Sequence, residues 1–347
     1  MTTASQEPAE KPHGGVEAGG RCVLVTGGAG YIGSHAVLEL LDAGFRVVVL
    51  DNLVTGFRWA IDPRAAFVEG WVEDDALVRR LLRDHDVCGI LHFAGSTIAP
   101  ESVRDPLKYY RNNTVASRSL LESVVAARVR HFVFSSTAAV YGPPGLGPVS
   151  EDSALQPATP YGWSKLMTER MLQDVAASYP FNYCALRYFN VAGADPLGRA
   201  GPSSVSATHL IKVAVEVALG KRSEVTVYGN DFATPDGTGI RDYIHVSDLA
   251  RAHVLALEKL FAWPRLSHVL NCGYGLGHSV LEVLDMVGQT AGRPIPRRLG
   301  PRRPGDFDCV VADNRHLKEH LAWRPRYEDL RVIITDALRW EERKSNL

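Results

Sequence analysis

The stretch from Arg21 to Gly33, RCVLVTGGAGYIG, constrains the fold of this chain more than any other. A short apolar run, VLV, leads directly into closely spaced glycines and suits a strand that is covered on both faces, as in a parallel sheet. Gly28, Gly30 and Gly33 fit the spacing G-x-G-x-x-G, and Gly27 with the last two equally fits G-x-x-G-x-x-G. Without Cβ atoms, these residues allow a tight turn and a close approach of the backbone to a diphosphate. The stretch therefore predicts a strand, a phosphate-binding turn and a helix.

The next strand-like run ends in a carboxylate. Ile32, Ala36 and Leu40 share one helical face, and residues 46–51 then form a second apolar run that ends at Asp51. The acidic residue of a dinucleotide fingerprint stands roughly 20 residues beyond the glycines, as Asp51 does. A glycine-rich turn alone can be an ordinary strand-to-helix connection, but this order favours a dinucleotide site. Because Asp51 can accept hydrogen bonds from ribose hydroxyls and repels a 2′-phosphate, the predicted cofactor is NAD rather than NADP.

Strand-like and helical patterns alternate through the first half of the chain. Further strands are predicted at residues 66–68, 88–93, 131–135 and 183–186. This order indicates an α/β fold, a Rossmann-type doubly wound parallel sheet with a smaller α/β substrate-binding domain. The predicted boundaries are a disordered tail at 1–20, the dinucleotide domain at 21–189, and the substrate domain mainly at 190–347, with some later segments returning to the sheet.

Composition narrows the class of protein. The 347 residues are 46% hydrophobic and 22% charged, enough for a large domain and a smaller one. A net charge of −1 gives no case for nucleic acid, although the basic stretch 293–303 suggests an anionic small molecule. Residues 1–20 lack the apolar core of a signal peptide, and no run is long enough to cross a membrane, so a cytoplasmic protein without membrane partners is expected. The five cysteines lack metal-ligand spacing, which favours reduced thiols and no metal site.

Two hydroxyl-bearing motifs carry the expected chemistry. The triplet Ser135, Ser136 and Thr137 follows a predicted strand, and Tyr161 precedes Lys165 by four residues. If Pro160 opens a helix, the phenol and the ammonium lie on one face. A nearby positive charge favours phenolate and lowers the tyrosine pKa, as a general base requires. An isolated Y-x-x-x-K is more often a surface pair, but the upstream hydroxyls and the dinucleotide turn favour an active site.

With these motifs, the sequence resembles the extended short-chain dehydrogenase/reductases. Within that family it resembles the UDP-glucose 4-epimerases, also called UDP-galactose 4-epimerases. The resemblance covers residues 21–340 and is carried by VTGGAGYIGSH, LDNL, HFAG, ESVRDPLKYYRNN, FVFSSTAAVYG, PYGWSKLMTE, LRYFNVAGA, THLI, DGTGIRDYIHVSDLA, LNCGYGLGHSV and RRPGD. It implies NAD-dependent interconversion of UDP-galactose and UDP-glucose at C4 through a 4-keto sugar.

The resemblance also implies the site residues, position by position. The catalytic trio would be Thr137, Tyr161 and Lys165. The NAD site would comprise Gly27, Gly30, Tyr31, Ile32, Gly33, Asp51, Asn52, Leu53, Val54, Thr55, Gly56, Trp71, Val72, Phe93, Ala94, Gly95, Thr97, Asn112, Tyr161, Lys165 and Phe189. The nucleotide-sugar site would comprise Thr137, Tyr161, Asn190, Thr208, His209, Leu210, Tyr228, Arg241, Arg303, Asp306 and Val310.

Some positions depart from the family pattern, and other functions stay open. Trp71 and Val72 replace the Asp-Ile pair that contacts adenine in relatives, and Thr97 stands where many relatives place a lysine. Alternatives are a dehydratase or a UDP-pentose 4-epimerase of the same superfamily, and a catalytically silent NAD-binding regulatory protein. Ala138 and Ala139 argue against a dehydratase, because they offer no acidic side chain beside Thr137.

Two further expectations concern assembly and specificity. Residues 106–125 and the helix near Tyr161 match the dimer helices of the family, so a homodimer is expected; Leu120, Leu121, Val124 and Val125 supply apolar area for it but could equally face the chain's own sheet. Val310 falls where relatives differ between a bulky tyrosine and a small residue. Valine would leave room for an N-acetyl group and hence for UDP-N-acetylhexosamines, unless it is simply an inward strand residue or Phe307 fills the space.

Overall fold

The structure is a computed structural model that describes residues 20–143, 147–203, 208–263, 266–303 and 305–344. The predicted disordered tail, apart from Gly20, lies outside the described residues.

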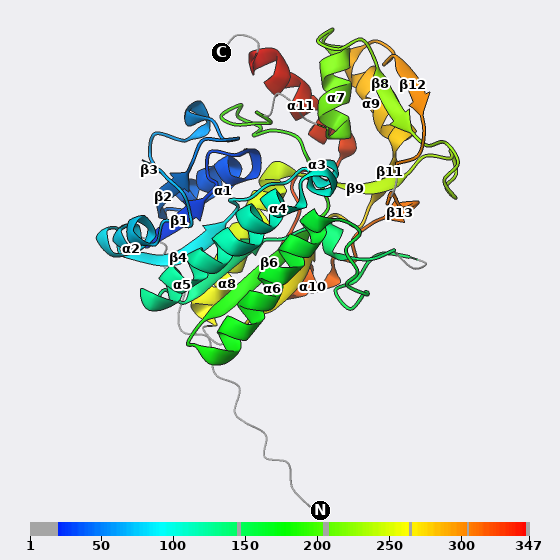
Figure 1. Ribbon diagram of the computed structural model, residues 1–347. Helices are drawn as coiled ribbons and strands as arrows, with labels where there is room; N and C mark the ends of the chain where they lie inside the picture. The colour runs from blue at the N-terminus through cyan, green and yellow to red at the C-terminus, as the bar shows by residue number, and fades with distance from the viewer. Residues whose placement is uncertain (1–19, 144–146, 204–207, 264–265, 304, 345–347) are drawn as a thin grey trace, which may run out of the picture.

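A seven-stranded parallel sheet forms the centre of the molecule (Figure 1). Its strands are β1 (Cys22–Thr26), β2 (Arg46–Asp51), β3 (Ala66–Glu69), β4 (Val87–His92), β5 (His131–Ser135), β6 (Asn182–Tyr188) and β10 (His268–Cys272). The order is β10-β6-β5-β4-β1-β2-β3, and every neighbouring pair is parallel. Because the order reverses between β1 and β4, a crevice for a ligand is expected at the carboxyl ends of these strands. The predicted doubly wound α/β fold is confirmed.

Helices cover both faces of this sheet, and the strand side chains alternate between them. Val23 and Val25 of β1 belong to a core shared with α1 (Tyr31–Asp42) and α8 (Val246–Ala262), while Cys22 and Leu24 face a second core with α2 (Asp75–Asp84), α5 (Ala116–Ala126) and α6 (Pro160–Ser178). Strands buried on both faces need nearly continuous apolar sequence, which is why the sequence pattern revealed them.

The sequence left open whether the apolar residues of α5 face a partner or the chain's own sheet. Leu120, Leu121 and Val124 are buried in the second core, against the chain's own sheet, whereas Val125 is half-buried. Upstream of α5 lie the short helices α3 (Ala99–Arg104) and α4 (Pro106–Tyr109) and a π-helical segment, Tyr110–Val115. Three of the four apolar residues assigned to a dimer contact are therefore core residues.

The later part of the chain builds a second lobe, at the upper right of Figure 1. A small sheet contains β7 (Asn190–Ala192), β9 (Ile240–His245), β11 (Gly277–Ser279) and β13 (Cys309–Val310), and β8 (Val225–Tyr228) pairs with β12 (Arg297–Gly300). The helices α7 (Leu210–Ala218), α9 (Val280–Ala291) and α11 (Leu330–Lys344) pack on one another. From this later half, β10 joins the large sheet, and α8 packs on that sheet against β5 and β6. The helix α10 (Arg315–Leu321) packs beside β10. Within the described ranges, no helix is both long and apolar enough to span a membrane.

Candidate active site

The glycine turn joins β1 to α1 with almost no space for side chains. Gly27 has φ +72°, and a Cβ on it would lie 2.6 Å from the backbone nitrogen of Ala94. A Cβ on Gly33 would lie 2.2 Å from the carbonyl oxygen of Gly27. Of the two spacings that the sequence allowed, the turn itself uses Gly27, Gly30 and Gly33, while Gly28 packs on Val49 of β2.

The N-terminus of α1 and the end of β2 face this turn. Gly30 is the N-cap of α1, so no cap side chain competes for the first amide groups of the helix. Asp51, at the end of β2, is 7% exposed, and its two carboxylate oxygens accept hydrogen bonds from the backbone nitrogens of Ala29 and Leu53, each at 2.9 Å. A glycine cradle, a free helix N-terminus and a fixed carboxylate fit the diphosphate and ribose of NAD.

The segment after Asp51 would hold the adenosine end. The side-chain oxygen of Asn52 accepts a hydrogen bond from the nitrogen of Val54 at 3.1 Å, and Leu53 adopts φ +56°. Val54 and Thr55 are exposed, whereas Gly56 is buried beside Asp51. Of the two residues that depart from the family pattern here, Trp71 is 48% exposed and Val72 is buried. The indole of Trp71 is thus free to stack on a base, while Val72 belongs to the core.

The loop after β4 closes the other side of the expected cofactor site. Gly95 has φ +154°, and a Cβ there would lie 2.8 Å from the Oδ1 atom of Asn113. That atom accepts a hydrogen bond from the nitrogen of Ser96 at 2.7 Å, and Asn113 donates to the Ser164 hydroxyl on α6 at 2.9 Å. Asn112 donates to the Ser96 hydroxyl at 3.0 Å. Asn113, which the sequence reasoning missed, therefore ties this loop to the helix that carries Tyr161 and Lys165.

Three neighbours of this loop complete its surroundings. Ala94 is half-buried beside the glycine turn, and Thr97 is exposed. The ring of Phe93 lies 4.7 Å from that of His253 on α8. Tyr31 and Ile32 open α1; the Tyr31 hydroxyl donates to the carbonyl of Gly193 at 2.6 Å and so joins the glycine turn to the second lobe.

The predicted catalytic trio lies at the carboxyl end of β5 and the start of α6. Pro160 stands at the first turn of α6 and Thr159 caps it, so the sequence signal for this helix is correct. Thr137, Tyr161 and Lys165 are each at least 93% buried, being 7%, 7% and 3% exposed. The Lys165 ammonium donates to the carbonyl of Ser135 at 3.0 Å.

Burial dominates the electrostatics of the trio. It raises the pKa of Tyr161 above its ordinary value, while a hydrogen-bonding interaction with Thr137 acts in the opposite direction. Burial lowers the pKa of Lys165 to about 8, and the carboxylate of Glu169 opposes that change. The expected fall in the pKa of Tyr161 is therefore not present in the polypeptide alone, because burial disfavours the charged phenolate.

The other hydroxyls of the triplet have structural partners. The Ser135 hydroxyl donates to Tyr188 at 3.1 Å, and the Ser136 hydroxyl donates to the buried carboxylate of Glu169. Thr137 accepts from the nitrogen of Ala139 at 3.1 Å and caps a 3₁₀ turn, Ala138–Val140. Thr137 is thus the member of the triplet that lies beside Tyr161.

The second lobe brings several predicted nucleotide-sugar residues together. Arg303 and Asp306 form an ion pair at 2.9 Å, and the guanidinium of Arg303 lies 4.9 Å from the ring centre of Tyr228. Arg241 on β9 lies 4.0 Å from the same carboxylate of Asp306. Two guanidiniums and an aromatic ring at one place suit an anionic, ring-bearing ligand such as a nucleotide diphosphate.

Val310 and Phe189 link this lobe to the trio. Val310 pairs in register with Arg241, and both Val310 and Ala138, the residue after Thr137, pack against an apolar cluster that contains Phe189. Asn190 is half-buried and opens β7. Of the predicted residues 208–210, Leu210 is the first residue of α7, His209 is its N-cap, and Thr208 precedes them.

Comparison with known proteins shows the family of this chain. The family model described as "NAD dependent epimerase/dehydratase family" matches residues 23–273. The chain belongs to this family. A UDP-glucose 4-epimerase from Azospirillum brasilense is 51% identical over 92% of this chain and 91% of its own length.

Solved epimerase structures share the whole fold. The UDP-glucose 4-epimerase from Stenotrophomonas maltophila, with bound NAD and formylated UDP-arabinopyranose, gives a TM-score of 0.91 at 39% identity and covers 94% of this chain and 99% of its own. The enzyme from Bifidobacterium longum, in complex with NAD+ and UDP, gives 0.88 at 37% identity, with 94% and 99% covered.

Proposed function

We propose that this member of the epimerase/dehydratase family interconverts UDP-galactose and UDP-glucose by NAD-dependent epimerisation at C4. The observation that carries the proposal is the placement of Thr137, Tyr161 and Lys165, all buried, at the end of β5 and the start of α6. The trio shares the carboxyl edge of the sheet with the glycine turn, and Val310 connects it to the two arginines of the second lobe.

Each member of the trio has a distinct part in the reaction. Tyr161, as phenolate, takes the proton of the sugar 4-hydroxyl, and Thr137 bridges the sugar oxygen and the phenol. Lys165 would hold the nicotinamide ribose of bound NAD and stabilise the phenolate by its charge. NAD, when bound, supplies a group that accepts a hydride from C4 and returns it to the opposite face of the sugar.

The nucleotide end of the substrate is held more firmly than its hexose. Arg241 and Arg303 would bind the diphosphate, with Tyr228, Asp306, Asn190 and residues 208–210 around the rest of the nucleotide. Since the sugar must turn over about its bond to the diphosphate before the hydride returns, a tight grip on UDP with few polar contacts to the hexose favours the reaction. Ala138 and Val310, which pack against the apolar cluster that contains Phe189, would offer the hexose no polar side chain and so fit this requirement.

A dehydratase is the alternative from the same family. Elimination needs further proton transfer near C5 and C6, and Ala138 and Ala139, which follow Thr137, cannot donate or accept a proton. The experiment is a time course with UDP-galactose, coupled to detection of UDP-glucose, and mass analysis of the nucleotide sugar. Formation of UDP-glucose with unchanged mass supports the proposal; a 4-keto-6-deoxy sugar would identify a dehydratase, and no conversion would favour a silent NAD-binding protein.

The same proposal extends to the setting of the enzyme. We place it in galactose metabolism in the cytoplasm, as a homodimer. The five cysteines are free, and Cys22, Cys184 and Cys272 are buried, as suits a reducing compartment. Apolar side chains stand exposed on α3, α4 and α6, and they support a partner on that face.

A further inference from the structure

A buried ion pair joins β6 to α6, the helix that carries Tyr161 and Lys165. The Nη2 atom of Arg187 on β6 lies 2.6 Å from Oε2 of Glu169 on α6, and its Nε atom lies 3.0 Å from Oε1. Both side chains are 5% exposed. In many proteins, the free energy of desolvating two buried charges is about as large as their mutual attraction. A protein with apolar residues in their place is often at least as stable. The contribution of this pair therefore lies in the segments that Glu169 and Arg187 each hold in place.

Glu169 connects the two elements that carry the trio. It lies one turn beyond Lys165 and two turns beyond Tyr161, on the same side of α6. Its carboxylate also accepts a hydrogen bond from the hydroxyl of Ser136, the residue before Thr137. One carboxylate thus fixes the end of β5 relative to the helix that bears the phenol and the ammonium.

Arg187 holds the other end of the Thr137 segment. Its Nη1 atom donates to the hydroxyl of Tyr141 at 2.9 Å and to the carbonyl of Glu151 at 3.4 Å. Tyr141 closes the 3₁₀ turn that Thr137 opens. Residues 136–141 are therefore held at both ends by the same ion pair, and Thr137 lies between the two attachments.

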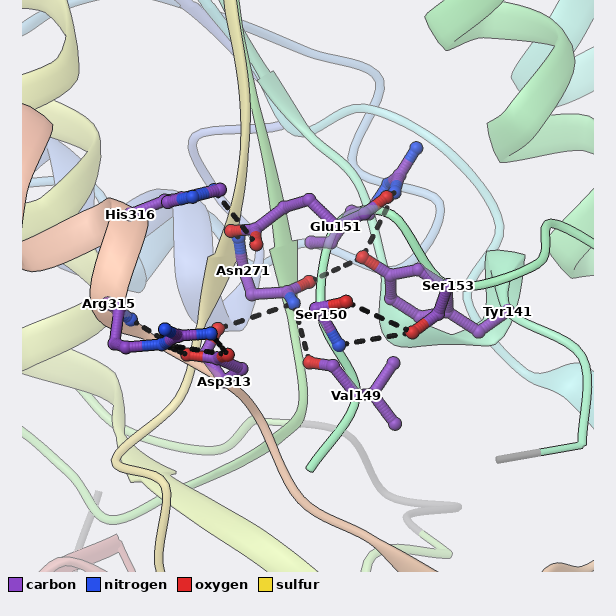
Figure 2. A network of polar contacts seen from close by, with 10 residues as sticks. Tyr141, Val149, Ser150, Glu151, Ser153, Asn271, Asp313, Arg315 and His316 are labelled. Carbon is purple, nitrogen blue, oxygen red and sulfur yellow. Dashed lines mark hydrogen bonds and ion pairs between the residues drawn. The ribbon is translucent and has the colours of Figure 1, made fainter. Parts of the chain in front are cut away.

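The attachment continues to β10, the edge strand next to β6, where Asn271 pairs in register with Arg187. The hydroxyl of Tyr141 donates to Oδ1 of Asn271 at 2.6 Å, and the backbone nitrogen of Asn271 donates to the carboxylate of Glu151 at 2.7 Å. Figure 2 shows both contacts. Asn271 also donates to the carbonyl of Val149 at 2.8 Å. Tyr141 is consequently fixed by β10 as well as by Arg187, and the turn after Thr137 has little freedom to move.

We infer that Glu169 and Arg187 are positioning residues of the epimerase reaction, which hold Thr137 in register with Tyr161 and set the charge environment of Lys165. This inference rests on the proposed function, because the trio is the site that the pair would serve. Neither residue touches the expected substrate or cofactor.

The charge of Glu169 bears on Lys165 directly. Around the ammonium lie Tyr161 on its own helix, the Ser135 carbonyl and the ring of Phe134 on β5, and His92 on β4, whose pKa burial lowers to about 3 and which is therefore neutral. Glu169 opposes the lowering of the Lys165 pKa by burial. Loss of the carboxylate would therefore make the Tyr161–Lys165 pair release its first proton at lower pH.

The test compares Glu169→Gln, Arg187→Met and the double variant in turnover of UDP-galactose. Each single variant leaves one buried charge without its partner and loses stability; the double variant removes both charges and should regain much of that stability. We expect kcat of the double variant to stay about 10- to 100-fold below wild type, with KM nearly unchanged, because Thr137 is no longer held in place. The limb of the kcat–pH profile that reports the Tyr161–Lys165 pair should also move to lower pH.

A second buried ion pair supplies the matched control. Glu341 on α11 pairs with Lys212 and Lys221, remote from the trio, so Glu341→Gln should lower stability and leave that pH limb where it is. The inference is overturned if the double variant recovers both stability and kcat, or if its pH limb coincides with that of wild type. If wild type itself turns over no UDP-sugar, the proposed function fails instead. The two failures are thereby distinguished.

Discussion

At Lys165, burial and function make opposite demands on one nitrogen atom. Burial favours the neutral amine and lowers the pKa to about 8, yet the proposed reaction needs the ammonium to stabilise the Tyr161 phenolate. Burial likewise raises the pKa of Tyr161. Tyr161 and Lys165 lie one helical turn apart, so in the proposed active form, with phenolate and ammonium, we expect them to release their protons in coupled steps.

Removal of the ammonium should therefore change the pH dependence as well as the rate. In Lys165→Met the phenol loses its neighbouring positive charge, so its pKa rises further and the rising limb of kcat against pH moves to higher pH. Lys165→Arg keeps a positive charge and is the control. A profile of Lys165→Met that rises at the same pH as that of wild type would show that the ammonium does not tune Tyr161.

The small side chain of Val310 predicts a sugar pocket wide enough for an N-acetyl group. Its side chain is small and half-buried, and it packs against the apolar cluster that contains Phe189, as does Ala138, the residue after Thr137. We expect wild type to accept UDP-N-acetylgalactosamine in addition to UDP-galactose, and Val310→Tyr to lose about 10-fold or more in kcat/KM for the acetylated sugar alone. Val310→Ala keeps the space open and serves as the control. Equal acceptance of the acetylated sugar by the tyrosine variant would place the gate elsewhere.

Among the elements, the C-terminal helix α11 supports the segment that would hold the adenosine end of the cofactor. Trp340 is 3% exposed; its indole nitrogen donates to the carbonyl of Pro202 at 3.1 Å, and its ring lies 5.8 Å from that of Trp59. Trp59 lies in a 3₁₀ turn, Arg58–Ala60, that follows the Asp51 loop. Residues distant in sequence thus shape the cofactor site.

This contact predicts unequal effects of two tryptophan substitutions. Trp340→Ala should lower the free energy of unfolding by about 3–5 kcal/mol, because it leaves a cavity in the core. Trp59→Ala, at a side chain 45% exposed, should cost about 0.5 kcal/mol or less. Both should release NAD faster than wild type. Urea denaturation and NAD retention on gel filtration are the measurements, and equal unfolding midpoints for the two variants would contradict the assigned packing.

The elements that the sequence predicted best are those whose signal is local. The strands at 46–51 and 131–135 have the predicted bounds because a strand buried on both faces is apolar throughout, and α6 begins where Thr159 and Pro160 indicate. The predicted strand at 183–186 extends to Asn182–Tyr188, since its last residues include the buried Arg187, whose charge disguises the pattern. Asn113 and Glu169 escaped notice for a related reason: their importance lies in contacts across the fold.

At the scale of the whole molecule, the proposed homodimer would bury apolar side chains that are exposed on α3, α4 and α6. Val103 is 61% exposed, Leu107 76%, and Trp163 and Met167 41% each. These residues, rather than the buried Leu120, Leu121 and Val124, offer the area for a second copy of the chain. A symmetric dimer would cover the same face on both subunits.

Sedimentation at micromolar concentration should accordingly show twice the chain mass of 37.9 kDa. Leu107→Glu places a charge in the centre of the proposed contact and should shift the protein toward monomer. Leu197→Glu, at a leucine 72% exposed in a loop of the second lobe, should leave the dimer intact. A wild-type protein that sediments only as a single chain would contradict the homodimer.

The central claim is that the Tyr161 hydroxyl carries the proton of the sugar 4-hydroxyl, and Tyr161→Phe tests it most directly. The change removes one oxygen atom from a side chain that is 7% exposed, so the pocket keeps its shape. We predict that kcat for conversion of UDP-galactose to UDP-glucose falls by about 100- to 10,000-fold, while UDP-glucose still binds, as measured by calorimetry. Full turnover in this variant, with binding intact, would contradict the claim.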